Sequence, residues 1–528
     1  MILKHRALLA PLTLVLALPA LADPPDGFEA RVEQLRVRSG APGIAIAIVE
    51  KGKTTLARGW GVRKLRDTAP VDADTIFFTG STGKALTAAA LAVLVDQGKI
   101  QWDDRVIDHM PWFRMYDPWV TREITVRDLL VHRSGLGLGA GDLLFVPRGS
   151  LSRKETVKRL AFIKPTTSFR SSYAYDNVLY AVAGQLIEEV TGKTWEDFMT
   201  QDVFKRGGMN TATASYAARL ATRNRAMQHA RIGGVVRGDG PLSMLDEREQ
   251  LGDAGSPAGG MALSANDLAR WLTIQLGRGA LPGGGRLYSE AQANEMWKGV
   301  TPLPIGSGGQ GPMAALTPKF SSYALGWNVA DYRGAKIISH GGAVFGSIAQ
   351  VILLPEQEVG IALVVNAEEG AFLRGISQTL VDHYLGAPAQ DWPALFAAQY
   401  ERRIAGGKAA LSATKAAPAK VGPSLALERY AGTYRDPWYG DVVVTSGADG
   451  LRIDFTTTPR MAGRLVHHQY DTFVTRFDDK AIEPAYVTFA LDADGKVSRV
   501  SMKAESPIAD FSYDYHDLDL RPVAKVGK

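Results

Sequence analysis

A serine and a lysine stand three positions apart, in Ser81-Thr82-Gly83-Lys84, directly before a strongly helical segment. On a helix, residues three positions apart share one face, with Cβ atoms about 5–6 Å apart. Burial and the positive end of a helix dipole both lower a lysine pKa, so Lys84 could act as a base beside the Ser81 hydroxyl. The alternative is that Ser81 only caps the helix and Lys84 is solvated, because S-x-x-K often occurs by chance.

A phenol and an amide follow in Tyr175-Asp176-Asn177, after a loop rich in serine and arginine and before another amphipathic segment. The Tyr175 phenol could accept or relay the Ser81 proton if neighbouring cations lowered the pKa of Tyr175. Asn177 could hydrogen-bond both Lys84 and the carbonyl side of a substrate. The alternative is an asparagine that caps the helix beside a packed tyrosine.

A third group of interest, His340-Gly341-Gly342-Ala343, precedes a pair of strand-like runs that begins at Ala349. Two glycines in a strand let a ligand approach the backbone closely, and a free N–H at a strand edge can bind an oxyanion. An ordinary glycine-rich turn is the alternative.

The elements that must position these groups alternate between strand-like and helix-like patterns from about Gly27 to Gly386. Strands near both ends, with helices between them, indicate one mixed sheet whose edges come from distant parts of the chain. The main predicted elements are a hairpin of Gly43–Glu50 with Lys53–Gly59, helices at Lys84–Gln97 and Asn177–Val190, and a second hairpin of Ala349–Leu354 with Gly360–Val365.

The composition changes after Asp391. One more helix is predicted at Leu395–Ile404, and Ala409–Ser424, rich in Ala, Lys and Pro, is predicted to be a linker. Short alternating segments then indicate a small antiparallel barrel or sandwich. The predicted strands are Asp441–Thr445, Leu451–Phe455, Thr472–Phe477, Ala485–Leu491, Val497–Lys503 and Asp510–Tyr515.

The first 22 residues predict export. Lys4 to Arg6 form a short basic start, Ala7 to Leu18 is apolar, and Ala20-Leu21-Ala22 precedes Asp23. This order is typical of a cleavable secretory signal, with an uncleaved anchor as the alternative. No later stretch is long and apolar enough to span a bilayer, so we expect a periplasmic or secreted protein without a stable membrane span after cleavage.

Composition excludes several other classes of protein. A chain of 528 residues is longer than one compact core usually needs, so we expect two folded units. The absence of cysteine excludes disulfides, thiolate metal sites and a lipidated N-terminal cysteine. The net charge of +5 is not concentrated in a block of Lys and Arg, so we expect no nucleic-acid partner.

Other catalytic patterns are missing or incomplete. There is no G-x-S-x-G elbow, and Gly83-Lys84-Ala85 lacks the Ser/Thr and the earlier glycine of a phosphate-binding loop. The G-x-G-x-x-G match at residues 306–311 is followed by Pro312, which predicts a loop. No H-E-x-x-H is present, so we expect neither a metal nor a cofactor, and we interpret His132 as structural.

Taken together, S-x-x-K, Y-x-N and H-x-G in this order resemble the motifs of the penicillin-recognising serine hydrolases. The closest branch is the class C β-lactamase-like one, which also holds D-aminopeptidases, DD-carboxypeptidases and esterases. The resemblance covers about residues 27 to 386. Residues from about Leu425 onward resemble a lipocalin-like C-terminal domain. Further matching segments are residues 124–130, 132–136, 180–184, 190–192, 259–261 with Ser264, and 323–327.

The resemblance implies an α/β fold of the β-lactamase/transpeptidase type, with an antiparallel sheet, an all-helical insertion and a small C-terminal antiparallel β-barrel. It implies that Ser81 is the nucleophile and that Lys84 and Tyr175 share the role of general base. Asn177 would orient Lys84 and the acyl group.

The same resemblance assigns the third motif to substrate binding. The oxyanion would lie between the backbone N–H groups of Ser81 and Ala343, next to Gly342. His340 takes the place of the lysine that opens this motif in true β-lactamases. Because histidine is near-neutral at pH 7, this difference argues against efficient β-lactam hydrolysis and leaves peptides, amides and esters open.

We therefore predict a signal peptide at 1–22, a β-lactamase-like domain at 23–390, a helix and linker at 391–424, and a lipocalin-like barrel at 425–528. The predicted function is an exported serine hydrolase that forms an acyl-enzyme on small peptides or amides containing D-residues. A carboxylesterase or β-lactamase with the same core is one alternative, and a non-catalytic binding protein is another. The barrel could cover the cleft, mediate homo-oligomers or bind a ligand, and the sequence leaves these open.

Overall fold

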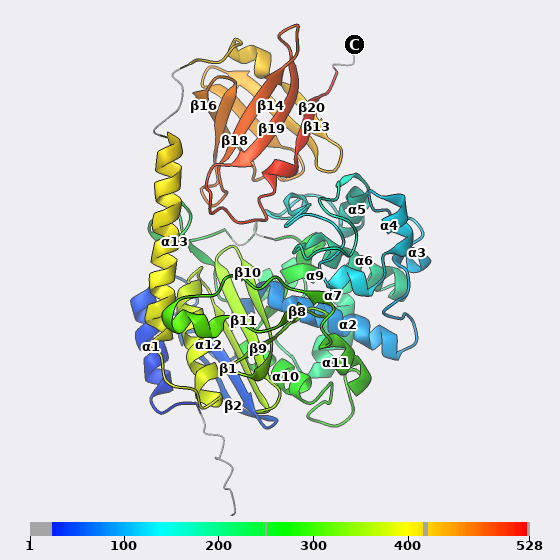
Figure 1. Ribbon diagram of the computed structural model, residues 1–528, viewed down its shortest axis with the longest axis vertical. Coiled ribbons are helices and arrows are strands. Elements are labelled where there is room, and N and C mark those ends of the chain that lie inside the picture. Colours follow the sequence, from blue (N-terminus) through cyan, green and yellow to red (C-terminus); the bar gives the residue numbers. More distant parts are fainter. Residues whose placement is uncertain (1–23, 247, 249–250, 416–420, 525–528) are drawn as a thin grey trace, which may run out of the picture.

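The computed structural model describes residues 24–246, 248, 251–415 and 421–524, so the predicted signal peptide lies outside the described residues. Two folded units are visible in Figure 1: a larger α/β unit and a C-terminal barrel, joined by the long helix α13 (Trp392–Lys415). Among the helices of the described residues, none combines the length and the apolar character needed to cross a bilayer.

The α/β unit is built on one eight-stranded sheet with the strand order β2-β1-β12-β11-β10-β9-β8-β7, in which every neighbouring pair is antiparallel. Along β1, Ile44, Ile46 and Ile48 face one apolar cluster and the intervening residues face the other. Helices cover both faces, as the period of two requires. The strands are β1 (Gly43–Glu50), β2 (Lys53–Gly61), β7 (Thr301–Pro302), β8 (Ser321–Tyr323), β9 (Asn328–Tyr332), β10 (Ala335–Val344), β11 (Ser347–Leu354) and β12 (Val359–Val365).

Both predicted hairpins are confirmed, β1 with β2 and β11 with β12. The prediction that the edges of the sheet come from distant parts of the chain is confirmed, because the edge strands are β2 and β7. The expectation of a mixed sheet is wrong, because short turns join most of the neighbouring strands, which therefore pair antiparallel. Apart from Glu50 at the end of β1, the paired strands β1 and β12 are apolar, and both are buried on both faces, as interior strands of a sheet are.

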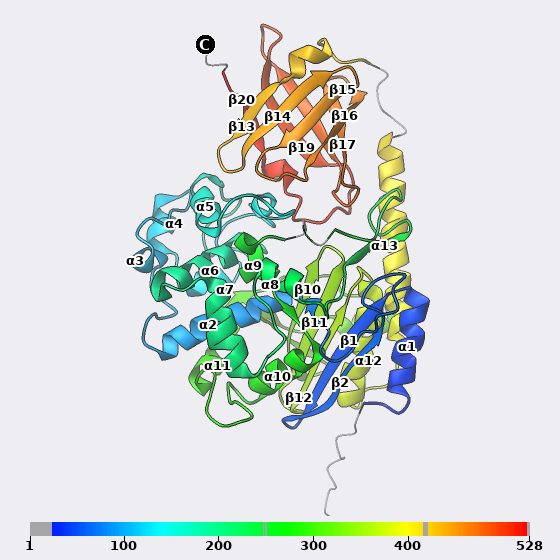
Figure 2. The same cartoon turned by 180° about the vertical axis from the view of Figure 1, so that it is seen from behind.

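Helices lie on the two faces of the sheet and form a separate lobe (Figures 1 and 2). The predicted helices over Lys84–Gln97 and Asn177–Val190 are confirmed as α2 and α6. The insertion is not all-helical, because β3 (Phe77–Phe78) pairs with β6 (Ala262–Leu263) and β4 (His229–Arg231) with β5 (Leu242–Met244). Strands this short carry no alternating pattern that a sequence could reveal. The helices are α1 (Phe28–Ser39), α2 (Lys84–Asp96), α3 (Val106–His109), α4 (Pro118–Glu123), α5 (Arg153–Lys158), α6 (Val178–Thr191), α7 (Trp195–Phe198), α8 (Tyr216–Ala221), α9 (Ser256–Gly259), α10 (Ala265–Leu276), α11 (Glu290–Met296) and α12 (Gly370–Tyr384).

The C-terminal unit is a closed eight-stranded barrel whose interior is filled by buried aromatic side chains, including Tyr439, Phe455 and Phe477. The prediction of a strand at Asp510–Tyr515 is wrong: this segment forms turns that lead into a short 3-10 helix at Tyr515–Asp517. The strands are β13 (Gly432–Asp436), β14 (Gly440–Gly447), β15 (Gly450–Phe455), β16 (Ala462–Gln469), β17 (Thr472–Phe477), β18 (Ala485–Leu491), β19 (Val497–Ala504) and β20 (Asp519–Pro522).

The two units are in direct contact. The predicted helix at Leu395–Ile404 extends over the whole of α13, into the predicted linker, because the alanine-rich start of that linker favours helix. Beyond the helix, Ser150 donates its backbone N–H to the carbonyl of Thr457 (2.8 Å), and Arg237 donates to the carbonyl of Ala481 (2.6 Å). The barrel therefore rests on the α/β unit with a cleft at their junction.

Candidate active site

Ser81 lies in a 3-10 turn (Gly80–Gly83) that continues directly into α2, so Ser81 and Lys84 stand one turn apart. The Lys84 Nζ atom lies 3.0 Å from Ser81 Oγ. Gly80 allows this turn to approach β10, because it has a φ of 54° and a Cβ added there would lie 2.6 Å from the backbone nitrogen of Ala343. The serine is partly exposed, whereas the lysine is fully buried.

The hydrogen bonds of Lys84 orient its amine. Nζ donates to Asn177 Oδ1 (2.6 Å) and to the backbone carbonyl of Ala258 (2.8 Å). Both oxygens can only accept, so they take the two N–H bonds of a neutral amine. The lone pair of a neutral Lys84 then faces the Ser81 hydroxyl, which is the arrangement of a base beside a nucleophile.

Burial lowers the pKa of Lys84 to about 7, although the charges of Asp142 and Asp176 act in the opposite direction. A large fraction of the lysine is therefore neutral at pH 7, when an ordinary lysine is almost fully protonated. The structure thus places a usable base within hydrogen-bond distance of the serine at neutral pH.

The Tyr175 phenol is hydrogen-bonded with Ser81, and its pKa does not shift in the direction needed for a base. Burial raises the pKa of Tyr175 well above 10, against a hydrogen bond with Ser81 that lowers it. The neighbouring cation does not reverse this, because Lys84 Nζ lies 4.7 Å from the centroid of the ring. A phenol that stays protonated can relay a proton but cannot remove the first one, so the geometry favours Lys84 for that step.

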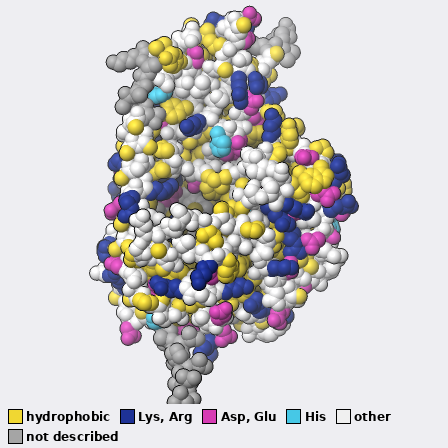
Figure 3. All heavy atoms as spheres, viewed as in Figure 1, with side chains coloured by type: hydrophobic (Ala, Val, Ile, Leu, Met, Phe, Trp, Pro, Cys, Tyr) yellow, Lys and Arg dark blue, Asp and Glu magenta, His cyan; other side chains and the backbone are white. Residues whose placement is uncertain are grey.

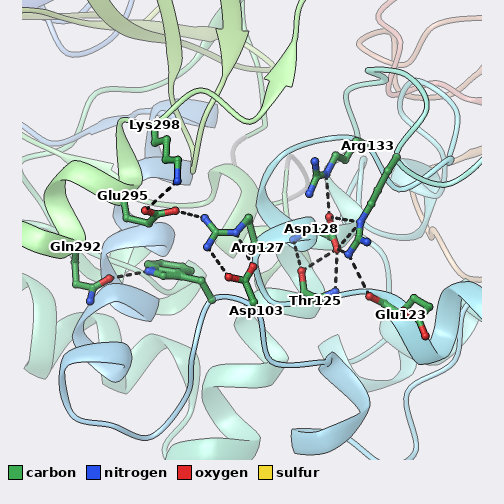
Figure 4. Close-up of polar contacts among 11 residues, drawn as sticks. Asp103, Glu123, Thr125, Arg127, Asp128, Arg133, Gln292, Glu295 and Lys298 are labelled. Atoms are coloured by element: carbon green, nitrogen blue, oxygen red, sulfur yellow. Dashed lines mark hydrogen bonds and ion pairs between the residues drawn. The ribbon is translucent and has the colours of Figure 1, made fainter.

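The loop that carries Tyr175 is held by a buried carboxylate, Asp128, which lies between two arginines (Figure 4). Asp128 accepts hydrogen bonds from Arg133 Nε (2.9 Å) and Arg170 Nη2 (2.5 Å). The backbone N–H of Arg170 also donates to the carbonyl of Arg133 (2.7 Å). These contacts fix the start of the loop. The segments 124–130 and 132–136, which resemble the family in sequence, therefore serve to position the loop of Tyr175.

His132 packs against the same loop. It is buried, and its Nδ1 accepts a hydrogen bond from the backbone N–H of Asp176 (3.2 Å). Its ring centroid lies 4.3 Å from that of Tyr175 and 4.5 Å from that of Tyr323. A packing role therefore accounts for this histidine, and no cluster of His, Asp and Glu suited to a metal ion occurs in the described part of the chain.

The third motif lies on β10, which packs against the Ser81 turn. A Cβ added at Gly342 would lie 2.1 Å from the carbonyl oxygen of Thr79 and 3.1 Å from the backbone nitrogen of Ser81, so only glycine fits. On its other side β10 pairs with β9 only as far as Ser339. The backbone N–H groups of Ser81 and Ala343 therefore meet beside an open strand edge, where an oxyanion could accept from both.

His340 is buried and neutral. Its Nδ1 donates to the carbonyl of Gly341 (2.5 Å), which leaves Nε2 to accept from the hydroxyl of Tyr323 (2.7 Å). Burial, together with the charge of Lys84, lowers the pKa of His340 to about 3. This residue therefore offers no positive charge to a substrate at neutral pH, in contrast to a lysine at the same position.

Three polar residues of the site were not predicted from the sequence: Asp142, Ser512 and Asp514. Asn177 Nδ2 donates to Asp142 Oδ2 (2.8 Å), and Ser512 Oγ donates to the same oxygen (2.8 Å). Asp514 accepts from the backbone N–H of Gly141 (2.8 Å) and so holds the turn that carries Asp142. A hydrogen-bonded chain thus runs from Ser512 through Asp142 and Asn177 to Lys84.

Asp142 is fully buried, and burial raises its pKa to about 7, while the hydrogen bonds from Asn177 and Ser512 lower it. No local pattern could have revealed this group. Ser512 is separated from Asp142 by 370 positions in the sequence, and the segment around Ser512 alternates as a strand would. Only the docking of the barrel brings the two residues together.

Ser81 and Asn177 line a cavity of about 620 Å³ at the junction of the two units. Its size falls within the range of small-ligand sites, about 300–1,000 Å³. Figure 3 shows the surface hollowed between the barrel and the α/β unit, beside α13. The loop before β20 contributes Ile508, Asp510 and Ser512 to the lining, so the barrel covers part of the cleft.

Comparisons with known proteins agree with this geometry. Residues 28–384 match the Beta-lactamase family, and residues 416–522 match a domain of unknown function (DUF3471). An unguisins hydrolase from Aspergillus campestris is 28% identical over 524 residues, which cover 92% of this chain and 91% of that protein.

Two solved structures share the fold. The octameric penicillin-binding protein homologue from Pyrococcus abyssi has a TM-score of 0.57 at 20% identity, covering 91% of this chain and 98% of that one. The D-amino acid amidase from Ochrobactrum anthropi has a TM-score of 0.54 at 20% identity, covering 68% and 97%. With the match over residues 28–384, these findings place the chain in the β-lactamase family, as a serine hydrolase of the penicillin-recognising type.

Proposed function

We propose that this chain is a peptidase or amidase that acts on D-residue-containing substrates through an acyl-enzyme on Ser81. The observation that carries the proposal is the Lys84 amine, which is buried, has a pKa of about 7 and lies 3.0 Å from Ser81 Oγ. Its other two contacts are acceptors, so its lone pair is directed at the serine.

In the first half-reaction, Ser81 Oγ attacks the substrate carbonyl carbon while Lys84 Nζ takes the hydroxyl proton. The backbone N–H groups of Ser81 and Ala343 stabilise the oxyanion. The C–N bond then breaks, and the proton passes to the leaving amine, with the Tyr175 hydroxyl as the relay. In the second half-reaction, water attacks the Ser81 ester and Lys84 accepts a proton from that water. The bond between the acyl carbon and Ser81 Oγ then breaks, Lys84 returns the proton to Oγ, and the carboxylic acid is released.

The choice of D-residue peptides and amides is supported by the kind of protein that shares this fold, one of which is a D-amino acid amidase. The whole-length relative is named as a hydrolase of unguisins. The neutral His340 supports amides over β-lactams, because it supplies no cation for the carboxylate that a lysine at this position would bind.

A panel of matched substrates tests the proposal. The mature protein is assayed with D-Phe-D-Leu, L-Phe-L-Leu, D-Phe amide, p-nitrophenyl butyrate and benzylpenicillin, with the Ser81→Ala variant beside it. We expect the D-configured peptide or amide to have the highest kcat/KM and the variant to be inactive. A higher kcat/KM for the L-peptide, the ester or the penicillin would overturn the assignment of substrate class.

We propose in addition that the protein is exported, on the basis of the basic start, apolar run and small-residue site in residues 1–22. Expression of the full chain and of a form lacking residues 2–22, followed by fractionation and N-terminal sequencing, tests this. Export with a mature N-terminus at Asp23 supports the proposal, and retention of the uncut full chain in the cytoplasm contradicts it.

A further inference from the structure

Three buried carboxyl groups lie where the barrel docks onto the α/β unit. Asp142 belongs to the α/β unit, whereas Glu483 and Asp514 lie in two loops of the barrel. Figures 1 and 2 show loops of the barrel against the helical lobe of the α/β unit. Within the described part of the chain, none of the three forms an ion pair. We call these three groups the junction carboxyls.

The hydrogen bonds of Asp142 and Asp514 cross from one unit to the other. Asp514 of the barrel accepts from the backbone N–H groups of Gly141 (2.8 Å) and Leu143 (3.2 Å) in the α/β unit. Asp142 accepts from Ser512 Oγ of the barrel (2.8 Å). The docked barrel therefore holds these two carboxyl groups close together in a buried setting.

Glu483 lies in the loop that makes another docking contact, because Ala481 of this loop accepts from Arg237 of the α/β unit (2.6 Å). Arg237 is already bound to Glu368 through two hydrogen bonds (2.6 and 2.8 Å). Among the described residues, neither Glu483 Oε1 nor Asp142 Oδ1 has a hydrogen-bond partner, although both atoms are buried. A buried carboxylate that lacks such partners is costly, so docking favours the neutral acid.

The charges around the junction carboxyls do not outweigh their burial. Burial raises the pKa of Asp142 and of Glu483 to about 7, and that of Asp514 well above its usual range. The charged groups that face them are Lys84, Asp510 and Asp517, with Arg237, Arg403 and Glu368 around Glu483. The nearby phenols of Tyr175, Tyr513 and Tyr515 stay protonated, because burial raises the pKa of each well above 10.

Proton binding must therefore differ between the docked and the undocked barrel. A carboxyl group exposed to water has a pKa of about 4. The docked state holds protons that an undocked state would release between about pH 4 and about pH 7. Docking is then strongest in acid, weakens as the pH rises through this window and levels off above it.

We propose that the barrel docks with uptake of protons by the junction carboxyls, so that it covers the Ser81 cavity in acid and releases it as the pH rises. Ile508, Asp510 and Ser512 line that cavity from a loop of the barrel, so undocking widens its opening. The step consists only of proton transfer from water to carboxylates. It concerns the docking equilibrium, so it holds or fails independently of the proposed function.

Hydrogen exchange of backbone N–H groups, followed by mass spectrometry of the full chain after digestion, measures docking without substrate. Peptides that contain Gly141, Leu143 and Ser150 report on docking, because these N–H groups donate to Asp514 and Thr457 across the junction. A peptide from β12 reports on unfolding of the α/β unit. The exchange rate at each pH is divided by that of an unstructured peptide to give a protection factor.

Between pH 5 and pH 8, we expect the protection factor of the junction peptides to fall at least about tenfold, and that of β12 less than about threefold. Equal protection of the junction peptides at both pH values would overturn the proposal. A loss of the same size in β12 would also overturn it, because the whole α/β unit would then be unfolding.

Two single variants remove a titrating group and keep the shape of the neutral acid: Asp142→Asn and Glu483→Gln. Each should reduce the loss of protection between pH 5 and pH 8 at least about threefold, because one fewer proton is taken up on docking. Glu428→Gln, which changes an exposed carboxyl group of the barrel, is the matched control and should keep the full loss. A loss that stays unchanged in both junction variants would overturn the proposal.

Discussion

The two sides of Lys84 differ in where their residues come from. On the serine side, Ser81 lies three positions away in the same turn, and its hydroxyl faces the cavity. On the barrel side, Asn177, Asp142 and Ser512 form a hydrogen-bonded chain that crosses the junction of the two units. The serine side is local and open, whereas the barrel side is long-range and, at Asp142, fully buried.

The two sides of Lys84 have different roles: one gives the substrate access to Ser81, and the other sets the pKa of Lys84. The nucleophile must be reachable by substrate, so its side of the lysine is open. The charge that balances the lysine must be shielded from water, because its influence on a pKa is strongest in a buried setting. We therefore expect large losses of kcat from substitutions on the serine side and smaller, pH-dependent losses from substitutions on the barrel side.

The largest effect should come from Ser81→Ala. Removing the nucleophile of a serine hydrolase costs about 10⁴- to 10⁶-fold in kcat, because binding and the oxyanion donors alone leave little catalysis. Stopped-flow or discontinuous assays with the best substrate of the panel measure this loss. Ser172→Ala, at an exposed position, is the control and should retain full activity. An active Ser81→Ala protein would assign the nucleophile to another residue.

Lys84→Met should come next, with kcat lowered about 10²- to 10⁴-fold, the usual contribution of a general base. Methionine keeps the length of the side chain and removes the amine that contacts Ser81, Asn177 and Ala258. Activity should fall while circular dichroism of the folded protein is unchanged. A variant that is folded and still within threefold of wild-type activity would show that another group removes the serine proton.

The pH profile compares the two sides directly. In wild-type protein, kcat/KM should rise as Lys84 loses its proton around pH 7 and then stay level, because the pKa of Tyr175 lies well above 10. The charge of Asp142 raises the pKa of Lys84, so Asp142→Asn should lower that pKa and move the rising limb to lower pH.

The plateau should fall less than about tenfold in Asp142→Asn, because the amide oxygen can still accept from Asn177 and Ser512. Asp494→Asn, an exposed change in a barrel turn, is the control and should leave the limb in place. A limb that stays at the same pH in Asp142→Asn, or that moves upward, would contradict the electrostatic role of the barrel side.

The smallest effect should come from Ser512→Ala, which removes the hydrogen bond that the barrel donates to Asp142. We expect kcat to fall less than about tenfold with KM nearly unchanged, and the free energy of unfolding to fall by about 1–2 kcal/mol. Chemical denaturation and steady-state kinetics measure both. Ser506→Ala, whose hydroxyl accepts from Ile508 within the same loop, is the matched control for kcat. An identical loss of kcat in both variants would show that the hydrogen bond from Ser512 to Asp142 has no specific effect on catalysis.

The serine side of Lys84, unlike the barrel side, could be predicted from the sequence. The fold of the α/β unit follows from apolar strands, amphipathic helices and three motifs whose spacing is visible in the chain. Ser81 and Lys84 are close because three positions on a helix make one turn. The proximity of Ser81 and Lys84 could therefore be predicted without knowledge of the tertiary structure.

The barrel side could not be predicted in this way. Residues 510–515 alternate polar and aromatic side chains, and this alternation alone predicts a strand. Burial in the structure does not follow that period, because Phe511 is exposed whereas the polar Ser512 and Asp514 are buried. The direction of the Tyr175 pKa shift also escaped prediction, since burial is a tertiary property. The roles assigned to Ser81, Lys84, Tyr175, Asn177, His340, Gly342 and Ala343 stay predictions, which the experiments described here test.

The role of Lys84 as the base of Ser81 is best tested by the rate at which a fluorophosphonate labels Ser81 as a function of pH, followed by intact-mass spectrometry and peptide mapping. We expect a single adduct on Ser81, absent from Ser81→Ala, with a labelling rate that rises to half of its maximum near pH 7, where Lys84 loses its proton. No adduct on folded protein, an adduct on a different residue, or a rate that is independent of pH would contradict it.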